Sequence, residues 1–165
     1  MTIRQRFGML SSVIRNIRYG EDLKNEELLP RIRCPQHSFA YDNRCYAFYM
    51  SPKSWMDAAF KCRKRPYGDL VSVLTESEAN FVATLINESN NETPLVWIGL
   101  HDPSEGSFPN TWEWIASNVM DYVAWEYGVP TGSGYRGTVS YRSGYKYWKG
   151  HDCTKHLPYV CKFRY

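Results

Sequence analysis

Two groups of side chains in this chain are of types that can do chemistry. His151, Cys153 and His156 form the pattern His-x-Cys-x-x-His, which offers three zinc-ligand types close together. His101 stands beside Asp102, and such a pair could act as a general base. No nucleophile accompanies that pair, so we interpret it as a hydrogen bond that fixes a loop. We interpret the other three as surface polar residues and keep a metal site as the weaker alternative.

A glycine pattern resembles a cofactor site. Gly132, Gly134 and Gly137 have the G-x-G-x-x-G spacing of dinucleotide-binding loops. Such a loop follows a strand and opens a helix, whereas here no strand precedes it closely and residues 138–141 are typical of a strand. The sequence therefore predicts no bound nucleotide, no cofactor and no catalytic group, so we expect a protein that is not an enzyme.

Residues 97–114, WIGLHDPSEGSFPNTWEW, organise the chain. The apolar residues 96–100 predict a buried strand, and Trp112-Glu113-Trp114 alternates like a second strand with both indoles on one face. The residues between them favour turns, namely Pro103, Gly106, Pro109 and Asn110. A loop held between two aromatic strands is more typical of a recognition surface than of a linker.

Composition narrows the class of protein. The 165 residues are enough for one domain plus a tail. The net charge of +3 is too small to indicate a nucleic-acid partner, and no apolar run is long enough to cross a membrane. Aromatic residues make up 16% of the chain, and their polar tips suit contacts with sugars or proteins as well as a core.

The N-terminal part differs from the rest. Residues 1–20 hold four arginines and no acid, and they lack the apolar run of a secretory signal. They fit a transit-like segment, an alternative or mispredicted first exon, or another kind of tail. Residues 21–32 carry the opposite, negative net charge. We interpret them either as a solvated linker or as an acidic pro-segment that screens a basic surface. A trypsin-like protease could cut at Arg31-Ile32, and residues 33–165 then form the domain.

Two helices are predicted after a small hairpin around residues 42–44. The first is capped by Ser51 or Ser54, and its apolar face has helical spacing, with Trp55, Ala58, Ala59 and Cys62. A basic cluster at the end of that helix consists of Lys61, Arg63, Lys64 and Arg65. We interpret it either as a solvated helix end or as a site that binds anions or membrane phosphates. The second helix opens at Thr75, which with Glu78 has capping-box spacing.

Strands are predicted at residues 70–74, 141–148 and 159–163, in addition to the two that flank the central loop. The order along the chain is a hairpin, then two helices, then short strands with long loops, and this order indicates an α+β fold. The five cysteines cluster near both ends of residues 34–161, which favours bridges that tie those ends together in an oxidising compartment. Cys34 and Cys45 flank the hairpin turn, and Cys62 faces inward. The odd count leaves at least one thiol without an internal partner.

The tryptophan motifs and the cysteine spacing resemble a C-type lectin-like domain, in which two helices pack on short antiparallel sheets with long loops. The residues that carry this resemblance are 97–100, 112–114, Trp148 and 159–163. Within that fold, residues 51–55, 64–66, 70–74, 101–103 and 157–163 look like the regenerating islet-derived (Reg) proteins, and most like the type III branch, also called pancreatitis-associated proteins.

The resemblance implies a secreted, extracellular protein of pancreas or gut with a pro-segment that trypsin removes, and Arg31-Ile32 matches that cleavage point. It also implies bridges Cys34–Cys45 and Cys62–Cys161. The family's third bridge would need a cysteine at Arg136, so Cys153 is left unpaired, either as a free thiol or as a link between chains. A homo-oligomer is therefore one of the expected states.

Two loops depart from the family's binding patterns. Calcium-dependent members use oxygen-bearing triplets where this chain has residues 129–131 and 148–150, and Val129, Lys149 and Gly150 offer no side-chain oxygens for calcium. Some type III members bind peptidoglycan through Glu-Pro-Asn, and here that triplet is Phe108-Pro109-Asn110. A phenylalanine can stack on a sugar but cannot accept its hydroxyl hydrogen bonds, so altered glycan binding is expected.

Two functions follow from the resemblance. The first is calcium-independent, lectin-like defence, in which the protein binds bacterial wall glycan or acidic lipid through the loop and the basic cluster. The second is hormone-like growth signalling through a cell-surface receptor that contacts residues 98–112, as the islet-neogenesis-associated relatives suggest, since they also carry an apolar residue before Pro-Asn. The loop residues assigned to either partner are His101, Glu105, Phe108, Pro109 and Asn110.

Overall fold

The computed structural model describes residues 33–89 and 92–165. The predicted segments 1–20 and 21–32, with the cleavage point Arg31-Ile32, lie outside the described residues. The elements in chain order are β1 (Phe39–Tyr41), β2 (Arg44–Lys53), α2 (Trp55–Cys62), β3 (Asp69–Leu70), α3 (Glu76–Glu88), β4 (Leu95–His101), β5 (Glu113–Trp114), η1 (Glu126–Gly128), β6 (Arg136–Ser140), η2 (Tyr141–Ser143), β7 (Trp148–His151) and β8 (Leu157–Phe163).

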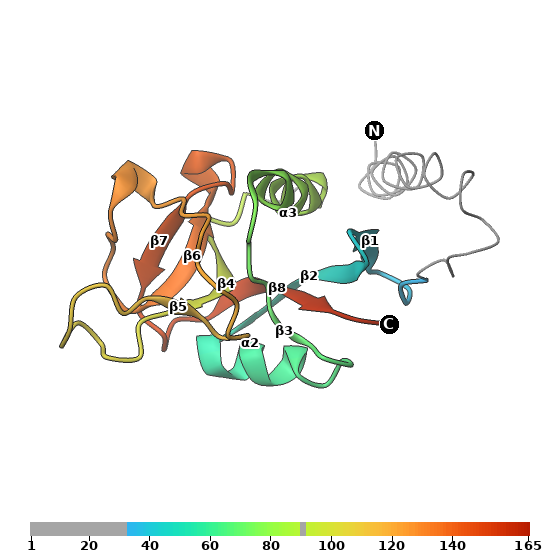
Figure 1. Cartoon of the computed structure of the whole chain (residues 1–165). Coiled ribbons are helices and arrows are strands. Elements are labelled where there is room, and N and C mark those ends of the chain that lie inside the picture. Colours follow the sequence, from blue (N-terminus) through green and yellow to red (C-terminus); the bar gives the residue numbers. More distant parts are fainter. Residues whose placement is uncertain (1–32, 90–91) are drawn as a thin grey trace.

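The described strands join in one hydrogen-bonded sheet of order β1-β2-β8-β4-β6-β7, with β3 paired to β8 and β5 paired to β4. All of these pairings are antiparallel except β4 with β8, which meet at Trp97 and Tyr159. The two helices lie on opposite sides of the central strands (Figure 1). The α+β prediction is confirmed, although the strands form one continuous sheet and not several short ones.

Helix α2 begins where the sequence indicated. The Ser54 hydroxyl accepts a hydrogen bond from the Asp57 backbone N–H at 3.2 Å, whereas Ser51 belongs to β2. Its predicted apolar face is buried in full, with Trp55, Ala58, Ala59 and Cys62 at 2% exposure or less. The face packs against β3 and β8, and Cys62 is thereby placed beside its disulfide partner on β8.

Helix α3 is capped by Thr75, whose hydroxyl accepts from the Glu78 N–H at 3.0 Å. The Glu78 side chain does not close a capping box on the Thr75 N–H. Its Oε1 accepts from the backbone N–H of Leu74 at 2.8 Å, and its Oε2 lies 2.7 Å from Lys162 Nζ. A residue that was expected to serve the helix end therefore also takes part in a buried ion pair.

Two strand predictions are partly wrong. Only Leu70 of residues 70–74 lies in a strand. Val71 makes just one backbone hydrogen bond to each neighbour: its N–H donates to Val160 O at 2.9 Å, and its carbonyl accepts from the Gly99 N–H at 2.8 Å. Residues 141–148 begin with η2, since the Ser140 hydroxyl caps that turn and Gly144 takes a left-handed φ of 70°. The strand there starts at Trp148.

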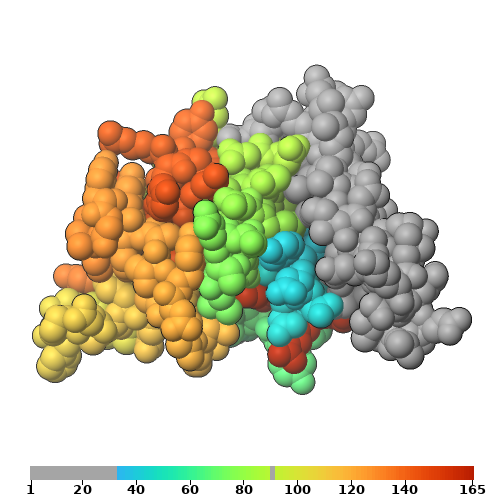
Figure 2. Space-filling model, turned by 45° about the horizontal axis from the view of Figure 1, so that its top comes forward, coloured from blue at the N-terminus to red at the C-terminus, as the bar shows by residue number. Residues whose placement is uncertain are grey.

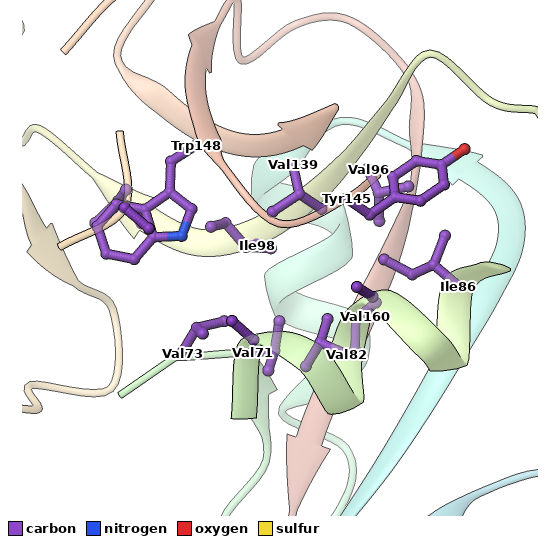
Figure 3. Close-up of a cluster of buried hydrophobic side chains, with 14 of the residues drawn as sticks. Val71, Val73, Val82, Ile86, Val96, Ile98, Val139, Tyr145, Trp148 and Val160 are labelled. Atoms are coloured by element: carbon purple, nitrogen blue, oxygen red, sulfur yellow. The ribbon is translucent and has the colours of Figure 1, made fainter. Parts of the chain in front are cut away.

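The main core lies between α3 and the sheet. Val82 and Ile86 of α3 point toward Val96, Val139 and Val160 of the strands (Figure 3). Five tryptophans are buried, which supports their assignment to the core, and these are Trp55, Trp97, Trp114, Trp125 and Trp148. Trp112 is partly buried and packs edge-on against Trp125 at 4.8 Å between ring centroids. Large aromatic surfaces of this kind supply much of the burial energy of a small domain.

Both implied disulfides are present. Cys34 is bonded to Cys45, and Cys62 to Cys161, which ties α2 to the last strand. Cys153 is free and half-buried. Among the described residues, no helix is both long and apolar enough to cross a bilayer.

Candidate binding loop at residues 102–112

Residues 102–112 form a loop between β4 and β5. Its base is closed by two antiparallel pairs, Leu100 with Trp114 and His101 with Glu113. The loop projects from the end of the molecule that is far from β1 and the C-terminus (Figure 1), and its residues lie at the edge of the surface view (Figure 2, yellow). The predicted loop between two aromatic strands is therefore confirmed.

A buried carboxylate holds this loop in one shape. Asp102 is only 2% exposed. Its Oδ1 accepts from the Ser104 N–H at 2.9 Å, from the Ser104 hydroxyl at 2.7 Å and from the Thr111 hydroxyl at 2.6 Å. Its Oδ2 accepts from the Gly106 N–H at 3.1 Å. One side chain therefore ties the start, middle and end of the loop together.

These bonds act on the pKa of Asp102. Burial alone would raise it, but the hydrogen bonds from Thr111, Ser104 and Gly106 outweigh burial and hold the pKa below the usual 3.8. Since the folded pKa lies below the unfolded one, the carboxylate stabilises the fold above pH 4 or so, and this contribution is lost as pH falls through the folded pKa.

Replacing Asp102 with alanine is expected to lower the free energy of unfolding by about 2–3 kcal/mol at pH 7, because several charge-assisted bonds are lost while the loop donors can still reach water. Urea unfolding of wild type, Asp102→Ala and Asp102→Asn checks this. Asparagine keeps one acceptor oxygen and should fall between the two. The difference between wild type and Asp102→Asn should shrink at pH 3, and a difference independent of pH would contradict the role of the charge.

The loop is also attached to the neighbouring loop before β6. The Asp102 N–H donates to Tyr135 O at 2.9 Å. Gly106 has a left-handed φ of 84°, which favours glycine, and a Cβ there would lie 2.7 Å from the Tyr135 hydroxyl. Glu105 Oε1 lies 3.8 Å from Arg136 Nη2. Two of the chain's irregular loops thus support each other.

The tip of the loop displays the predicted contact residues. Phe108, Pro109 and Asn110 are all exposed, and the Phe108 side chain keeps 68% of its surface in solvent. The Phe108 N–H donates to the Ser104 hydroxyl at 3.3 Å, and its carbonyl accepts from Thr111 at 3.1 Å. Asn110 has a left-handed φ of 57°. The tip is therefore apolar, solvent-facing and held by the Asp102 network.

His101 and Glu105 differ in their access to a partner. The His101 ring stacks on Trp55 at 5.2 Å, and its Nε2 lies 3.3 Å from Glu113 Oε1. Burial lowers the pKa of His101 despite the nearby Glu113 carboxylate, which favours the neutral ring at pH 7. We predicted that His101 and Asp102 fix the loop, and Asp102 does so. Of the two predicted contact residues, Glu105 is exposed and His101 is half-buried.

Comparison with known proteins matches residues 51–163 to the lectin C-type domain. Lithostathine of Bos taurus is 49% identical over 148 residues, which cover 87% of this chain and 85% of the relative. Regenerating islet-derived protein 3-gamma of Homo sapiens is 48% identical over 149 residues, with 88% and 85% covered. The crystal structure of human lithostathine superposes with a TM-score of 0.76 at 38% identity, covering 83% of this chain and 96% of that one.

The chain belongs to the regenerating islet-derived (Reg) family of C-type lectin-like proteins. The family and fold predictions are confirmed. Lithostathine and the 3-gamma protein match this chain at nearly equal identity, so the type III assignment stays a prediction from the motifs.

In this Reg chain, Arg136 makes noncovalent contacts with its neighbours. It stands where the family resemblance implies a cysteine, and its register partners are His101 on β4 and His151 on β7. Its guanidinium lies over the Trp55 ring at 5.0 Å, a cation–π contact. Cys153 remains close to α2, since its carbonyl accepts from the Trp55 N–H at 3.1 Å.

The metal candidates of this Reg chain are not assembled into a site. The His151 ring packs against Trp97 and its Nδ1 lies 3.3 Å from Ser133 Oγ, while His156 is exposed. Within residues 33–89 and 92–165, no three His, Cys, Asp or Glu residues are grouped to hold a metal ion. The alternative of a metal at His151, Cys153 and His156 therefore has no support from the fold.

The region matched to the family's calcium triplets is closed by backbone contacts. The Gly150 N–H donates to Thr131 O at 2.6 Å. A Cβ on Gly132, which has φ 114°, would lie 1.9 Å from Gly150 O. Thr131 and Gly132 thus meet Gly150 backbone to backbone, and Val129 and Lys149 bring no carboxylate to this region.

The predicted basic cluster lies at the end of α2 and is largely in solvent. Lys61, Arg63 and Lys64 are exposed. Arg63 Nε is 3.1 Å from Asp69 Oδ1, and the Arg65 guanidinium lies over the Phe163 ring at 5.5 Å. The adjacent Cys62 bridge holds this helix end in place, so its exposed lysines are presented from a rigid support.

Ser104 and Thr111, which complete the Asp102 network, were not predicted from the sequence. The signal was present, since Asp-Pro-Ser is typical of a turn in which the aspartate accepts from the N–H two residues later. Thr111 carried no such local signal, because its bond to Asp102 spans the whole loop. The contact between Arg136 and Trp55 was also missed, and it joins elements that are far apart in sequence.

Proposed function

We propose that this Reg protein is a secreted, calcium-independent, lectin-like protein that binds bacterial wall glycan through residues 102–112. The observation that carries the proposal is the exposed Phe108-Pro109-Asn110 tip on a loop that the buried Asp102 holds in one shape. A preorganised tip loses little conformational entropy on binding. We further propose that the protein is a binding protein without enzymatic activity, made with a pro-segment cut at Arg31-Ile32.

The tip offers two kinds of contact to a sugar. The Phe108 ring can stack on the apolar face of a pyranose, and the Asn110 amide can donate to and accept from hydroxyl groups. A glutamate in place of Phe108 would accept stronger, charge-assisted hydrogen bonds. We therefore propose weak binding to peptidoglycan, with the exposed Lys61 and Lys64 adding attraction to acidic lipid.

A second candidate function is favoured by the same apolar tip. An aromatic side chain with 68% of its surface in solvent is a typical anchor for a protein partner. In this alternative the protein is a hormone-like factor, and a cell-surface receptor covers Phe108 and the neighbouring residues of 98–112.

A pull-down on insoluble peptidoglycan tests the choice. Phe108→Glu is expected to raise retention about tenfold, because a carboxylate adds charge-assisted hydrogen bonds to sugar hydroxyls. Tyr147→Glu is a matched control, since Tyr147 is 49% exposed just before β7, away from the loop and the basic cluster, and should leave retention unchanged. The readout is the bound fraction against protein concentration.

The other outcomes decide between the two functions. If wild type binds tightly and Phe108→Glu adds nothing, the assignment of the tip to sugar contact is wrong. If neither protein binds while cells respond to wild type and not to Phe108→Glu, the receptor function is supported.

A further inference from the structure

We propose a second saccharide site, separate from the 102–112 loop, in a cavity of about 700 Å³ lined by the β1–β2 turn, residues 67–75 and the end of β8. This volume is in the usual range for small-molecule sites. Its lining includes Tyr41 of β1 and Lys162 of β8, and also Ala116 and Asn118, which follow β5. Residues 102–112 do not line it, and their loop projects from the end of the molecule that is far from β1 (Figure 1). The inference does not rest on the proposed function of the loop.

The floor of the cavity is a fully paired ionic cluster. Lys162 Nζ lies 2.7 Å from Glu78 Oε2 and donates to Ser72 O at 3.2 Å and to Ser72 Oγ at 3.3 Å. The buried Tyr46 hydroxyl donates to the same Glu78 oxygen. An ammonium group has three donors, and all three are used here. The floor is therefore rigid and offers no free charge to a ligand.

The rim carries both signs of charge in equal number. Asp42 and Asp69 bring carboxylates, and Arg44 and Arg164 bring guanidinium groups. One Asp69 oxygen already pairs with Arg63, outside the cavity, at 3.1 Å. Because these charges balance, the rim does not attract an ion of either sign. It does offer hydrogen-bond acceptors and donors to a ligand whose groups can both donate and accept. Sugar hydroxyls are donors and acceptors at once. The rim thus fits a neutral polyhydroxylated ligand better than a phosphate or a cation.

Two rigid turns present this rim. Asp42 and Asn43 form the two-residue connection of β1 and β2, and both have left-handed φ values, 45° and 61°, as in the tight hairpin turns that favour Asn and Asp. On the other side, the Gly68 N–H donates to Arg65 O at 2.9 Å, and a Cβ on Gly68 would lie 2.1 Å from Cys62 O. That turn is therefore packed against the bridged end of α2.

An aromatic platform stands on the second turn. Tyr67 is 84% exposed, and its backbone φ is 51°, a strained value for a tyrosine. The Arg164 guanidinium lies over its ring at 5.1 Å, and the Arg164 N–H donates to Pro66 O at 3.0 Å. A ring held in this way, beside carboxylates and guanidinium groups, has the composition that sugar binding requires: a flat apolar face with polar groups around it.

The test uses the full chain, ¹⁵N-labelled, titrated with chitotetraose, with maltotetraose and with inorganic phosphate. At least one tetrasaccharide is expected to shift the amide signals of Asn43, Gly68 and Arg164. Tyr67→Ala should weaken that binding about tenfold, the loss of one stacked ring. Tyr127→Ala is the matched control, because Tyr127 is 75% exposed with φ 64° and does not line the cavity.

Three results would overturn the proposal. They are no shift with either tetrasaccharide, shifts confined to residues 102–112, or binding of phosphate alone at these amides. The second result would leave the loop function intact, and Phe108→Glu, which should not change binding at the cavity, separates the two sites. Because Tyr67 is exposed, its truncation is expected to leave the fold unchanged, and the spectrum of the free variant checks this.

Discussion

Removal of the Cys62–Cys161 bridge by Cys62→Ala/Cys161→Ala is expected to lower the free energy of unfolding by about 4–5 kcal/mol. The bridge closes a loop of sequence separation 99, so the unfolded chain gains much conformational freedom when the bridge is absent. The bonded cysteines are also buried at the contact of α2 with β8. Urea unfolding at pH 7, in a Cys153→Ser background that leaves no free thiol to exchange, measures the loss.

The second bridge is the matched control. Cys34 and Cys45 are separated by only 11 residues, so Cys34→Ala/Cys45→Ala should cost about 3 kcal/mol. If chain entropy decides the outcome, the variant without the Cys62–Cys161 bridge must lose more stability than the variant without the Cys34–Cys45 bridge. Equal losses, or a larger one for the short bridge, would show that local strain or packing outweighs chain entropy in this fold.

Lys162→Met is expected to destabilise the protein by about 3–5 kcal/mol, because it leaves the Glu78 carboxylate buried without its counter-ion. Glu78 is 5% exposed and would keep only the Leu74 N–H and the Tyr46 hydroxyl as partners. Burial and the Glu78 charge raise the pKa of Tyr46, so the hydroxyl stays protonated and continues to donate. Thermal and urea unfolding give the measurement.

Two further variants test the assignment of this loss to the ion pair. Lys146→Met changes an exposed lysine and should alter stability by less than about 0.5 kcal/mol. The double variant Glu78→Gln/Lys162→Met removes both charges, and its loss of stability should be smaller than the sum of the losses for Glu78→Gln and Lys162→Met alone. Additive losses would show that the two groups do not act as a pair.

Several features could be predicted from the sequence because they depend on short spacings. The caps Ser54 and Thr75 hydrogen-bond to N–H groups three residues on, and the buried face of α2 follows from helical periodicity. The position of the 102–112 loop follows from the aromatic strands on each side, although Trp112, which was predicted to open the second strand, lies in the loop. The disulfide pairs were implied by the family resemblance, and the structure confirmed them.

The sequence by itself determined the fold class, the two helices and the loop that carries Phe108. Only the tertiary structure decided which polar groups those elements bring together. Glu78 has the spacing of a helix cap but pairs with Lys162 on the last strand, and Tyr67 looks like an ordinary loop residue until Arg164 stacks on it. These partners are far apart in the chain, and their contacts depend on the register of β3 and β2 on β8, which no local pattern encodes.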